Sequence, residues 1–155
     1  MLFAGMICLM LGDILQRDGV IGSKTDVLVM GTNAGFKPFE YIDNNEIVGF
    51  DVDLAREIAK SMGKELKIED MSFDGLLPAL DSGQIDMVAA GMTVTPERAK
   101  NALFSEPYYS ASQRIIVKKG SPIRNKHQLS GRKIGVQLGT TGDTLASKIS
   151  GASVT

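Results

Sequence analysis

The chain of 155 residues contains a single cysteine, a single histidine and no tryptophan. Cys8 cannot form a disulfide within the chain, and no paired spacing of cysteine or histidine indicates a metal site. The 17 lysines and arginines are dispersed among 18 acidic residues, and they do not interleave with aromatic residues as in grooves for single-stranded nucleic acid. We therefore expect no metal, no other cofactor and no nucleic-acid partner.

The apolar run at the N-terminus, residues 1–12, is too short to span a bilayer. It resembles the tail of a secretory signal without the basic segment that precedes such signals, and the alternative is a buried or artefactual N-terminal helix. We interpret residues 1–25 as a signal-like segment and linker, which favours a periplasmic or cell-surface location. Lipid attachment at Cys8 stays open, because residues 5–7 make a poor attachment motif.

From residue 26 onward, strand and helix signals alternate at short intervals, which predicts an α/β fold with helices packed on a sheet. One helix is expected from an N-cap at Asp51 to a stop at Gly63, with apolar residues at every fourth position. A second is expected from Phe73 to a stop near Gly83, and Leu145, Ala146 and Ile149 indicate a short third helix. The predicted strands are residues 27–32, 66–68, 85–90, 114–117 and 134–137.

The run from residue 89 to 98 is the most informative motif, because an apolar strand ends in glycine and leads directly into a capped helical turn. Gly91 allows a ligand to approach the backbone, and Thr95 is a suitable N-cap before a proline. Arg98 then falls in the first helical turn, where its guanidinium can converge with the Thr93 hydroxyl on a small anion. The motif predicts half of a binding site.

Two other turns also follow strands. Phe36 lies in a loop after the first strand, at the sheet edge where open α/β sheets bind ligands. Thr140 and Thr141 lie in a second strand-to-helix turn. Each of these residues has an ordinary structural interpretation as well: Arg98 as a surface arginine, Phe36 and Phe73 as core residues, and the threonines as helix caps.

Five motifs in a fixed order resemble those of one family. They are Gly-Phe-Asp-Val-Asp-Leu-Ala at 49–55, Phe-Asp-Gly-Leu-Leu-Pro-Ala-Leu at 73–80, the run 90–98, Phe-Ser-Glu-Pro-Tyr-Tyr at 104–109 and Gly-Val-Gln-Leu-Gly-Thr-Thr at 135–141. All are similar to polar amino-acid binding proteins of bacterial ABC importers, the solute-binding family 3. The resemblance covers residues 27 to about 150.

This resemblance implies a periplasmic-binding-protein-like fold of type II, in which two hinged lobes close on a free amino acid and a membrane permease recognises the closed form. Lobe 1 would span residues 26–111 without its C-terminal return, and residues 112–155 would form part of lobe 2. Members of the family run beyond this point. We therefore expect either a truncated chain with a frayed tail, completion by a partner, or a homo-oligomer formed by strand or lobe exchange, which we favour.

The resemblance also implies roles in binding. Arg98, the Thr93 region and the turn at Thr141 would hold the α-carboxylate, and the Gly91 carbonyl would accept from the α-ammonium. Phe36 and Phe73 would sandwich the ligand side chain, and Asn33 and Gln137 would determine which side chain is preferred. The aspartate that pairs with the α-ammonium in the family has no counterpart here. The bound amino acid stays unidentified. The predicted ligand-binding residues are Asn33, Phe36, Phe73, Ala90, Gly91, Met92, Thr93, Arg98, Gln137, Thr140 and Thr141.

Two other functions remain as alternatives. Cyclohexadienyl dehydratases resemble this family and use a carboxylate to expel a leaving group, for which Glu40 and Glu106 are the candidate acids. Neither belongs to an identifiable acid-base pair, so we expect no catalytic activity. The other alternative is a sensor module or a truncated remnant without transport activity.

Overall fold

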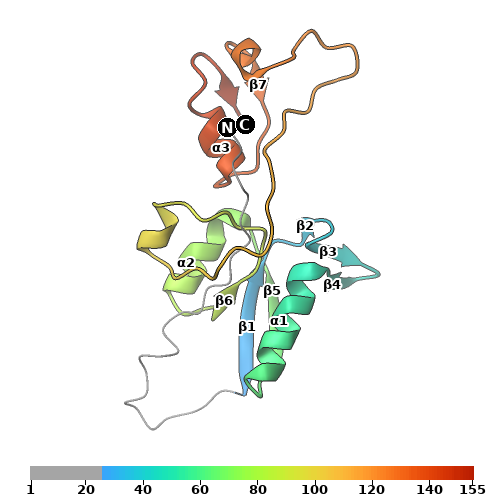
Figure 1. Ribbon diagram of the computed structural model, residues 1–155, viewed down its shortest axis with the longest axis vertical. Coiled ribbons are helices and arrows are strands. Elements are labelled where there is room, and N and C mark those ends of the chain that lie inside the picture. Colours follow the sequence, from blue (N-terminus) through green and yellow to red (C-terminus); the bar gives the residue numbers. More distant parts are fainter. Residues whose placement is uncertain (1–25) are drawn as a thin grey trace.

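The computed structural model describes residues 26–155, and Figure 1 shows them as two groups of elements along the long axis of the molecule. Cys8 and the signal-like segment lie outside the described residues, so the predictions made for them stay predictions. Within the described part, no helix combines the length and the apolar character needed to cross a membrane.

The larger group is built on β1 (Val27–Thr32), the central strand of a parallel sheet with the order β5-β1-β6. β5 (Glu65–Asp70) pairs with β1 along its whole length, whereas β6 (Met87–Val88) is much shorter than the strand predicted at 85–90. The apolar run in β1 fits a strand that is covered on both faces. The predicted α/β fold is confirmed.

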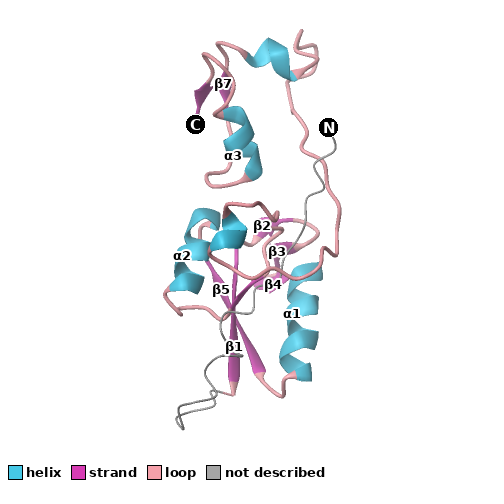
Figure 2. Cartoon of the chain, turned by 60° about the vertical axis from the view of Figure 1, so that its left-hand side comes forward, coloured by secondary structure: helices cyan, strands magenta, loops and turns pink. Residues whose placement is uncertain are grey.

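Helices cover both faces of this sheet, as Figure 2 shows. On one face, α1 (Phe50–Ser61) helps to bury a cluster formed by Leu28, Met30, Val52, Ala55, Ala59, Met87 and Ala89. On the other face, the 3₁₀ turn η1 (Phe73–Gly75) leads into α2 (Leu76–Asp81), which buries Leu76, Ala79, Ile85, Val88, Ala90 and Met92. Successive residues after Asp86 thus alternate between the two clusters, as strand geometry requires.

The prediction that Asp51 caps α1 is wrong, because the N-cap is Gly49 with a φ of 129°. A Cβ atom on Gly49 would lie 2.2 Å from the carbonyl oxygen of Phe39, so only glycine fits at this position. The backbone amides of Phe50 and Asp51 donate to the carbonyls of Pro38 and Phe39, which satisfies the first amides of the helix. The carboxylate of Asp51 therefore makes its hydrogen bonds elsewhere.

A small antiparallel sheet, which the sequence analysis did not predict, lies beside α1. It consists of β2 (Gly35–Phe36), β3 (Glu40–Asp43) and β4 (Glu46–Val48) in that order. Asn44 and Asn45 form the turn between β3 and β4 with φ values of 47° and 69°, a conformation that asparagine tolerates well. This sheet places Phe36 and Glu40 near the end of β1.

The second group contains η3 (Lys126–Leu129), β7 (Lys133–Ile134), α3 (Thr141–Ala146) and β8 (Ser153–Val154). β7 and β8 form a parallel pair, and Figure 1 shows β7 and α3 at the end of the molecule opposite to β1. The strand predicted at 134–137 forms only in part, since β7 ends at Ile134. The third helix includes Leu145 and Ala146 as predicted, but it ends at Ala146, before the predicted Ile149.

The strand predicted at 114–117 is wrong. Residues 111–120 are exposed and belong to no strand, and Ile116 keeps 94% of its surface accessible. A strand needs a neighbour to accept its backbone hydrogen bonds, and no segment of residues 26–155 pairs with this run. The run instead connects the two groups (Figure 1). The predicted lobe boundary at residue 111 stays a prediction.

Candidate functional site

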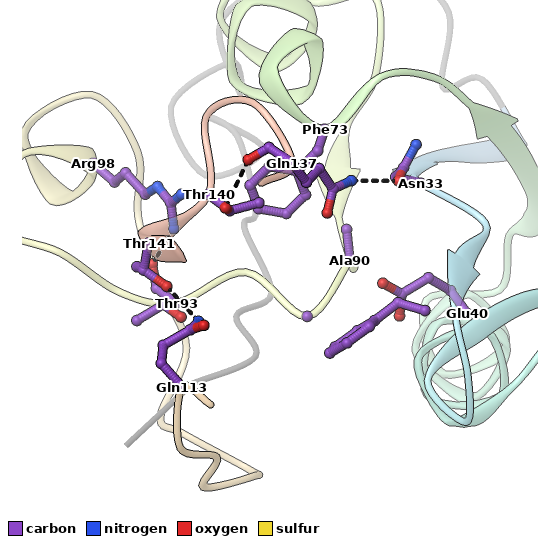
Figure 3. Close-up of a pocket in the computed structure, with 12 residues that line it drawn as sticks. Asn33, Glu40, Phe73, Ala90, Thr93, Arg98, Gln113, Gln137, Thr140 and Thr141 are labelled. Carbon is purple, nitrogen blue, oxygen red and sulfur yellow. Dashed lines mark hydrogen bonds between the residues drawn. The ribbon is translucent and has the colours of Figure 1, made fainter. Parts of the chain in front are cut away.

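A pocket of about 200 Å³ lies between the two groups, at the end of the parallel sheet where β1 and β6 finish. All of the predicted ligand-binding residues except Met92 line it, and Figure 3 shows their side chains converging from both groups. This is the edge at which open α/β sheets bind ligands. The lining residues are Asn33, Phe36, Glu40, Phe73, Ala90, Gly91, Thr93, Arg98, Gln113, Gln137, Thr140 and Thr141.

Met92 differs from the prediction. Its side chain is 1% exposed and packs in the cluster beneath α2 with Leu76 and Val88. Successive residues after β6 face opposite directions, so residue 92 faces the core and residue 91 faces the pocket. We therefore remove the Met92 side chain from the set of ligand contacts.

Gly91 is fixed by close neighbours on two sides. Its φ is 55°, and a Cβ atom would lie 2.9 Å from the ring carbons of Phe36. Its amide donates to the Asp51 carboxylate over 3.0 Å, which holds the turn in place. A residue with a side chain would be strained here and would collide with the Phe36 ring, so the predicted need for glycine has a steric basis.

Arg98 begins the short 3₁₀ turn η2 (Arg98–Lys100), whose N-cap position is Glu97 and not the predicted Thr95. The Arg98 amide still donates to the Thr95 hydroxyl over 3.2 Å. The guanidinium donates to the carbonyl of Thr93 over 2.6 Å and to that of Gly139 over 2.8 Å. Its Cζ atom lies 5.5 Å from the centre of the Phe73 ring. Burial lowers the pKa of Arg98 from its usual value. Arg98 thus joins the two groups at the pocket.

Two further hydrogen bonds cross the pocket (Figure 3). The Gln137 amide donates to the Asn33 side-chain oxygen over 2.8 Å, and Asn33 in turn donates to the carbonyl of Met71. The Gln113 amide donates to the Thr141 hydroxyl over 2.9 Å. Sequence reasoning missed Gln113, which follows an exposed segment with no motif of its own. Residues far apart in the chain are therefore coupled at this site.

Thr140 is a helix cap, which is the ordinary structural interpretation that its residue type allowed. It is the N-cap of α3, and its hydroxyl accepts from the amide of Asp143 over 3.2 Å. The same hydroxyl donates to the carbonyl of Gln137 over 2.7 Å. Thr140 still lines the pocket, so it fixes the turn that presents Gln137 and Thr141.

A buried pair of carboxyl groups closes one side of the pocket. Glu40 is 1% exposed and Asp51 is 0% exposed. Asp51 accepts from the amide of Gly91 over 3.0 Å and from the hydroxyl of Tyr108 over 2.9 Å. The oxygen Oε2 of Glu40 has no hydrogen-bond partner among the described residues. Sequence reasoning missed the pair, because it interpreted Asp51 as a cap.

Burial and the neighbouring Asp51 charge raise the pKa of Glu40 to about 10. Burial also raises the pKa of Asp51, while hydrogen bonds from Gly91 and Tyr108 lower it. At neutral pH, Glu40 is therefore protonated. Glu106, the other candidate acid, is exposed and does not line the pocket. Across residues 26–155, no group of three or more His, Cys, Asp or Glu side chains is arranged to hold a metal ion.

Comparison with known proteins agrees with this architecture. The model of the bacterial extracellular solute-binding proteins, family 3, matches residues 28–151. The arginine-binding extracellular protein ArtP of Bacillus subtilis (strain 168) is 50% identical over 113 residues, which cover 73% of this chain and 44% of that protein. This chain spans about half the length of the curated relatives that it matches.

Solved structures share the fold as well as the sequence. The structure of holo ArgBP from T. maritima is 50% identical with a TM-score of 0.80, and the match covers 84% of this chain and 59% of that one. The ancestral amino acid-binding protein AncCDT-1, a precursor of cyclohexadienyl dehydratase, is 40% identical with a TM-score of 0.78, covering 84% and 60%. The predicted periplasmic-binding-protein-like fold is confirmed. The chain belongs to the bacterial extracellular solute-binding proteins of family 3.

Proposed function

We propose that this chain binds a free amino acid in the pocket between its two groups of elements, outside the cytoplasm, for delivery to an ABC-type importer. The observation that supports this most strongly is the convergence of Arg98, Thr93 and Thr141 on one pocket (Figure 3). These residues supply a guanidinium and two hydroxyls, which are suitable donors for a carboxylate. Family membership supports the same function.

The α-carboxylate of the ligand binds at Arg98. The guanidinium already donates to two carbonyl oxygens, and these bonds orient it over the Phe73 ring. A carboxylate is a stronger acceptor than a carbonyl, so it competes well for the donors of a guanidinium that is partly withdrawn from water. We assign the α-ammonium to the carbonyl of Gly91, which lines the same pocket.

Binding is coupled to the arrangement of the two lobes, which we assign to residues 26–111 and 112–155. Two hydrogen bonds join the two lobes at the pocket, from Arg98 to Gly139 and from Gln137 to Asn33. A third, from Gln113 to Thr141, lies within the second lobe beside them. A ligand that contacts both lobes stabilises the closed arrangement only through contacts that an open one lacks. A permease in the membrane then recognises the closed form.

Titration calorimetry of the purified chain with single amino acids tests this proposal. Arginine is the first ligand to try, since relatives named above are arginine-binding proteins. We expect saturable one-to-one binding of at least one amino acid. Heat changes no larger than those of dilution for every amino acid would contradict the proposal.

A dehydratase is the second candidate, because Glu40 is a protonated carboxyl in the wall of the pocket and could act as a general acid. The similarity to a dehydratase precursor favours the same test. Turnover of prephenate by the purified chain, followed by absorbance, decides between the two. We expect no turnover, because no base within the described part is paired with Glu40 across the pocket.

A further inference from the structure

The charge of the chain is divided unevenly between the two groups of elements. Residues 26–111 contain 15 acidic residues and seven lysines or arginines, whereas residues 112–155 contain one acidic residue and eight lysines or arginines. The formal net charge of −1 over the whole chain conceals this division, so the charges are less evenly dispersed than whole-chain counts indicate. Figure 1 shows the two groups at opposite ends of the long axis. The molecule therefore has an acidic end and a basic end.

Most of the positive charge of the second group lies in residues 118–133, which we call the basic segment. Figure 1 draws this part of the chain in orange at the end of the molecule farthest from β1. No acidic residue occurs between Glu106 and Asp143. The segment has six exposed cationic side chains, and none of them forms an ion pair with any of residues 26–155. These residues are Lys118, Lys119, Arg124, Lys126, Arg132 and Lys133.

Hydrogen bonds within the chain give the basic segment a fixed course. The amide of Arg124 donates to the side-chain oxygen of Gln128 over 2.6 Å, and the amide of His127 donates to the side-chain oxygen of Asn125 over 3.0 Å. The guanidinium of Arg124 donates to two nearby backbone carbonyls, which orient the charge without neutralising it. The six charges therefore remain available to an external anion.

The composition of the basic segment favours a lipid surface over a nucleic acid or a protein. No aromatic residue occurs after Tyr109, so the segment offers nothing on which a base could stack. Protein interfaces are centred on apolar and aromatic side chains and are poor in lysine, but Leu129 of this segment is buried. Anionic headgroups need no such anchor, because clusters of about four to eight lysines and arginines bind them through charge.

The acidic end of a second copy is a poorer match for the basic segment. In the first group, Asp53, Glu57 and Glu69 already form ion pairs, and two further carboxyl groups, those of Glu40 and Asp51, are buried. The acidic charge of the first group is thus partly neutralised or inaccessible. A bilayer presents many exposed anionic groups in one plane.

We propose that the basic segment docks the chain on an anionic phospholipid bilayer, with the basic end towards the headgroups and the acidic end away from them. Attraction of the second group and repulsion of the first fix this orientation. None of the six cationic side chains lines the pocket, so docking leaves the pocket free. The inference goes beyond the proposed function and does not depend on it.

Co-sedimentation of the full chain with lipid vesicles tests the inference. We expect binding to vesicles of phosphatidylglycerol and phosphatidylcholine in equal parts at about 0.05 M NaCl, and binding at least about tenfold weaker at about 0.5 M NaCl, where salt screens the charges. Vesicles of phosphatidylcholine alone should bind the chain at least about tenfold more weakly than the mixed vesicles.

A pair of charge-reversal variants locates the docking surface. Lys118→Glu together with Lys119→Glu should weaken binding to the mixed vesicles by about tenfold or more. Lys60→Glu together with Lys67→Glu makes the same change of charge at exposed lysines of the first group, and it should weaken binding by less than about twofold. If the first variant fails to fold, Lys126→Glu with Lys133→Glu takes its place.

Three results would overturn the inference. Equal binding to neutral and anionic vesicles would show that apolar residues outside the basic segment attach the chain. Equal losses in the two charge-reversal variants would show that net charge acts rather than this segment. If the chain ignores vesicles but light scattering gives a mass that Lys118→Glu with Lys119→Glu lowers, the basic segment binds a second copy instead.

Discussion

At the residue scale, Arg98 makes the contacts on which the account depends most. Its guanidinium is half-buried, and it bonds to two backbone carbonyls rather than to an acidic side chain. A structural arginine of the core would more often be paired with a carboxylate. The arrangement holds a positive charge in position without neutralising it, which suits the binding of an anion.

Replacing Arg98 with alanine is expected to lower amino-acid affinity by about tenfold or more, since a charge-assisted hydrogen bond contributes about 1.5–3 kcal/mol. The free energy of unfolding should fall by about 1–3 kcal/mol, with the chain remaining folded, because two hydrogen bonds to carbonyls are lost. Calorimetric titration and urea denaturation measure the two effects. Arg114→Ala, an exposed arginine away from the pocket, is the control. Unchanged affinity, or loss of the folded state, would show that Arg98 is structural.

Gly91→Ala and Gly63→Ala form a matched pair. Both glycines have positive φ values, 55° and 66°, but a Cβ atom at Gly63 would have no neighbour within 4 Å, whereas at Gly91 it would meet the Phe36 ring. A left-handed alanine costs about 1 kcal/mol or more at either site. Urea denaturation should therefore show a larger loss for Gly91→Ala, and calorimetry should show weaker binding for that variant alone. Equal losses of stability and no change in binding would disprove the close contact.

At the scale of elements, the buried carboxyl pair joins parts of the chain that would otherwise be independent. Glu40 comes from β3, Asp51 from α1, and Asp51 also bonds to the turn after β6 and to Tyr108. The same two residues thus fix the small antiparallel sheet, the helix and the anion turn relative to one another. Contacts within the protein therefore hold this wall of the pocket in place.

The pair makes stability depend on pH. In the folded state the pKa of Glu40 is raised to about 10 from its ordinary value of 4.5, so the folded state binds the proton more tightly than the unfolded one. This contribution is fully present below the ordinary pKa of Glu40 and is lost as pH rises towards the folded value. We expect the free energy of unfolding to fall across this window, by at most about 1.4 kcal/mol per pH unit.

Urea denaturation at several pH values checks this expectation. Glu40→Gln should flatten the decline, because the amide does not titrate, whereas the exposed control Glu106→Gln should leave it unchanged. A wild-type stability that rises through the same window would show that Glu40 is ionised in the folded chain.

The elements show which parts of the structure can be predicted from sequence. β1 and α1 can be predicted from the spacing of their apolar residues. That spacing is required because both faces of the sheet are buried. The anion turn was predicted from its residue types, and the pocket contains nearly all of the predicted set. The antiparallel sheet was missed although Asn44 and Asn45 are typical hairpin residues, so this error lay in the interpretation.

Other features depend on tertiary partners that the sequence does not reveal. The run 114–117 has strong strand propensity, but a strand forms only when a neighbouring strand pairs with it. No strand within residues 26–155 lies beside this run. Asp51 has the residue type of a helix cap, yet Gly49 takes that position because its Cβ-free backbone passes close to Phe39. Glu40 and Gln113 line the pocket because of tertiary contacts, which no local sequence pattern indicates.

At the scale of the whole molecule, the exposed run between the two groups is the expected contact between copies of the chain. Ile115, Ile116 and Val117 are 47%, 94% and 39% exposed, and their backbone groups are not paired in a sheet. Unpaired extended segments of this kind promote association of chains edge to edge. We expect light scattering to give a mass above that of one chain, and Ile116→Lys to lower it. A wild-type mass equal to one chain would contradict self-association.

The central claim is that one amino acid contacts both groups of elements in a single pocket. A titration of the ¹⁵N-labelled chain with arginine, followed by amide chemical shifts, tests it most directly. We predict that the amides of Gly91 and Arg98 in the first group and of Thr141 in the second shift together, with the same midpoint. Shifts confined to one group, or midpoints that differ between the two, would contradict it.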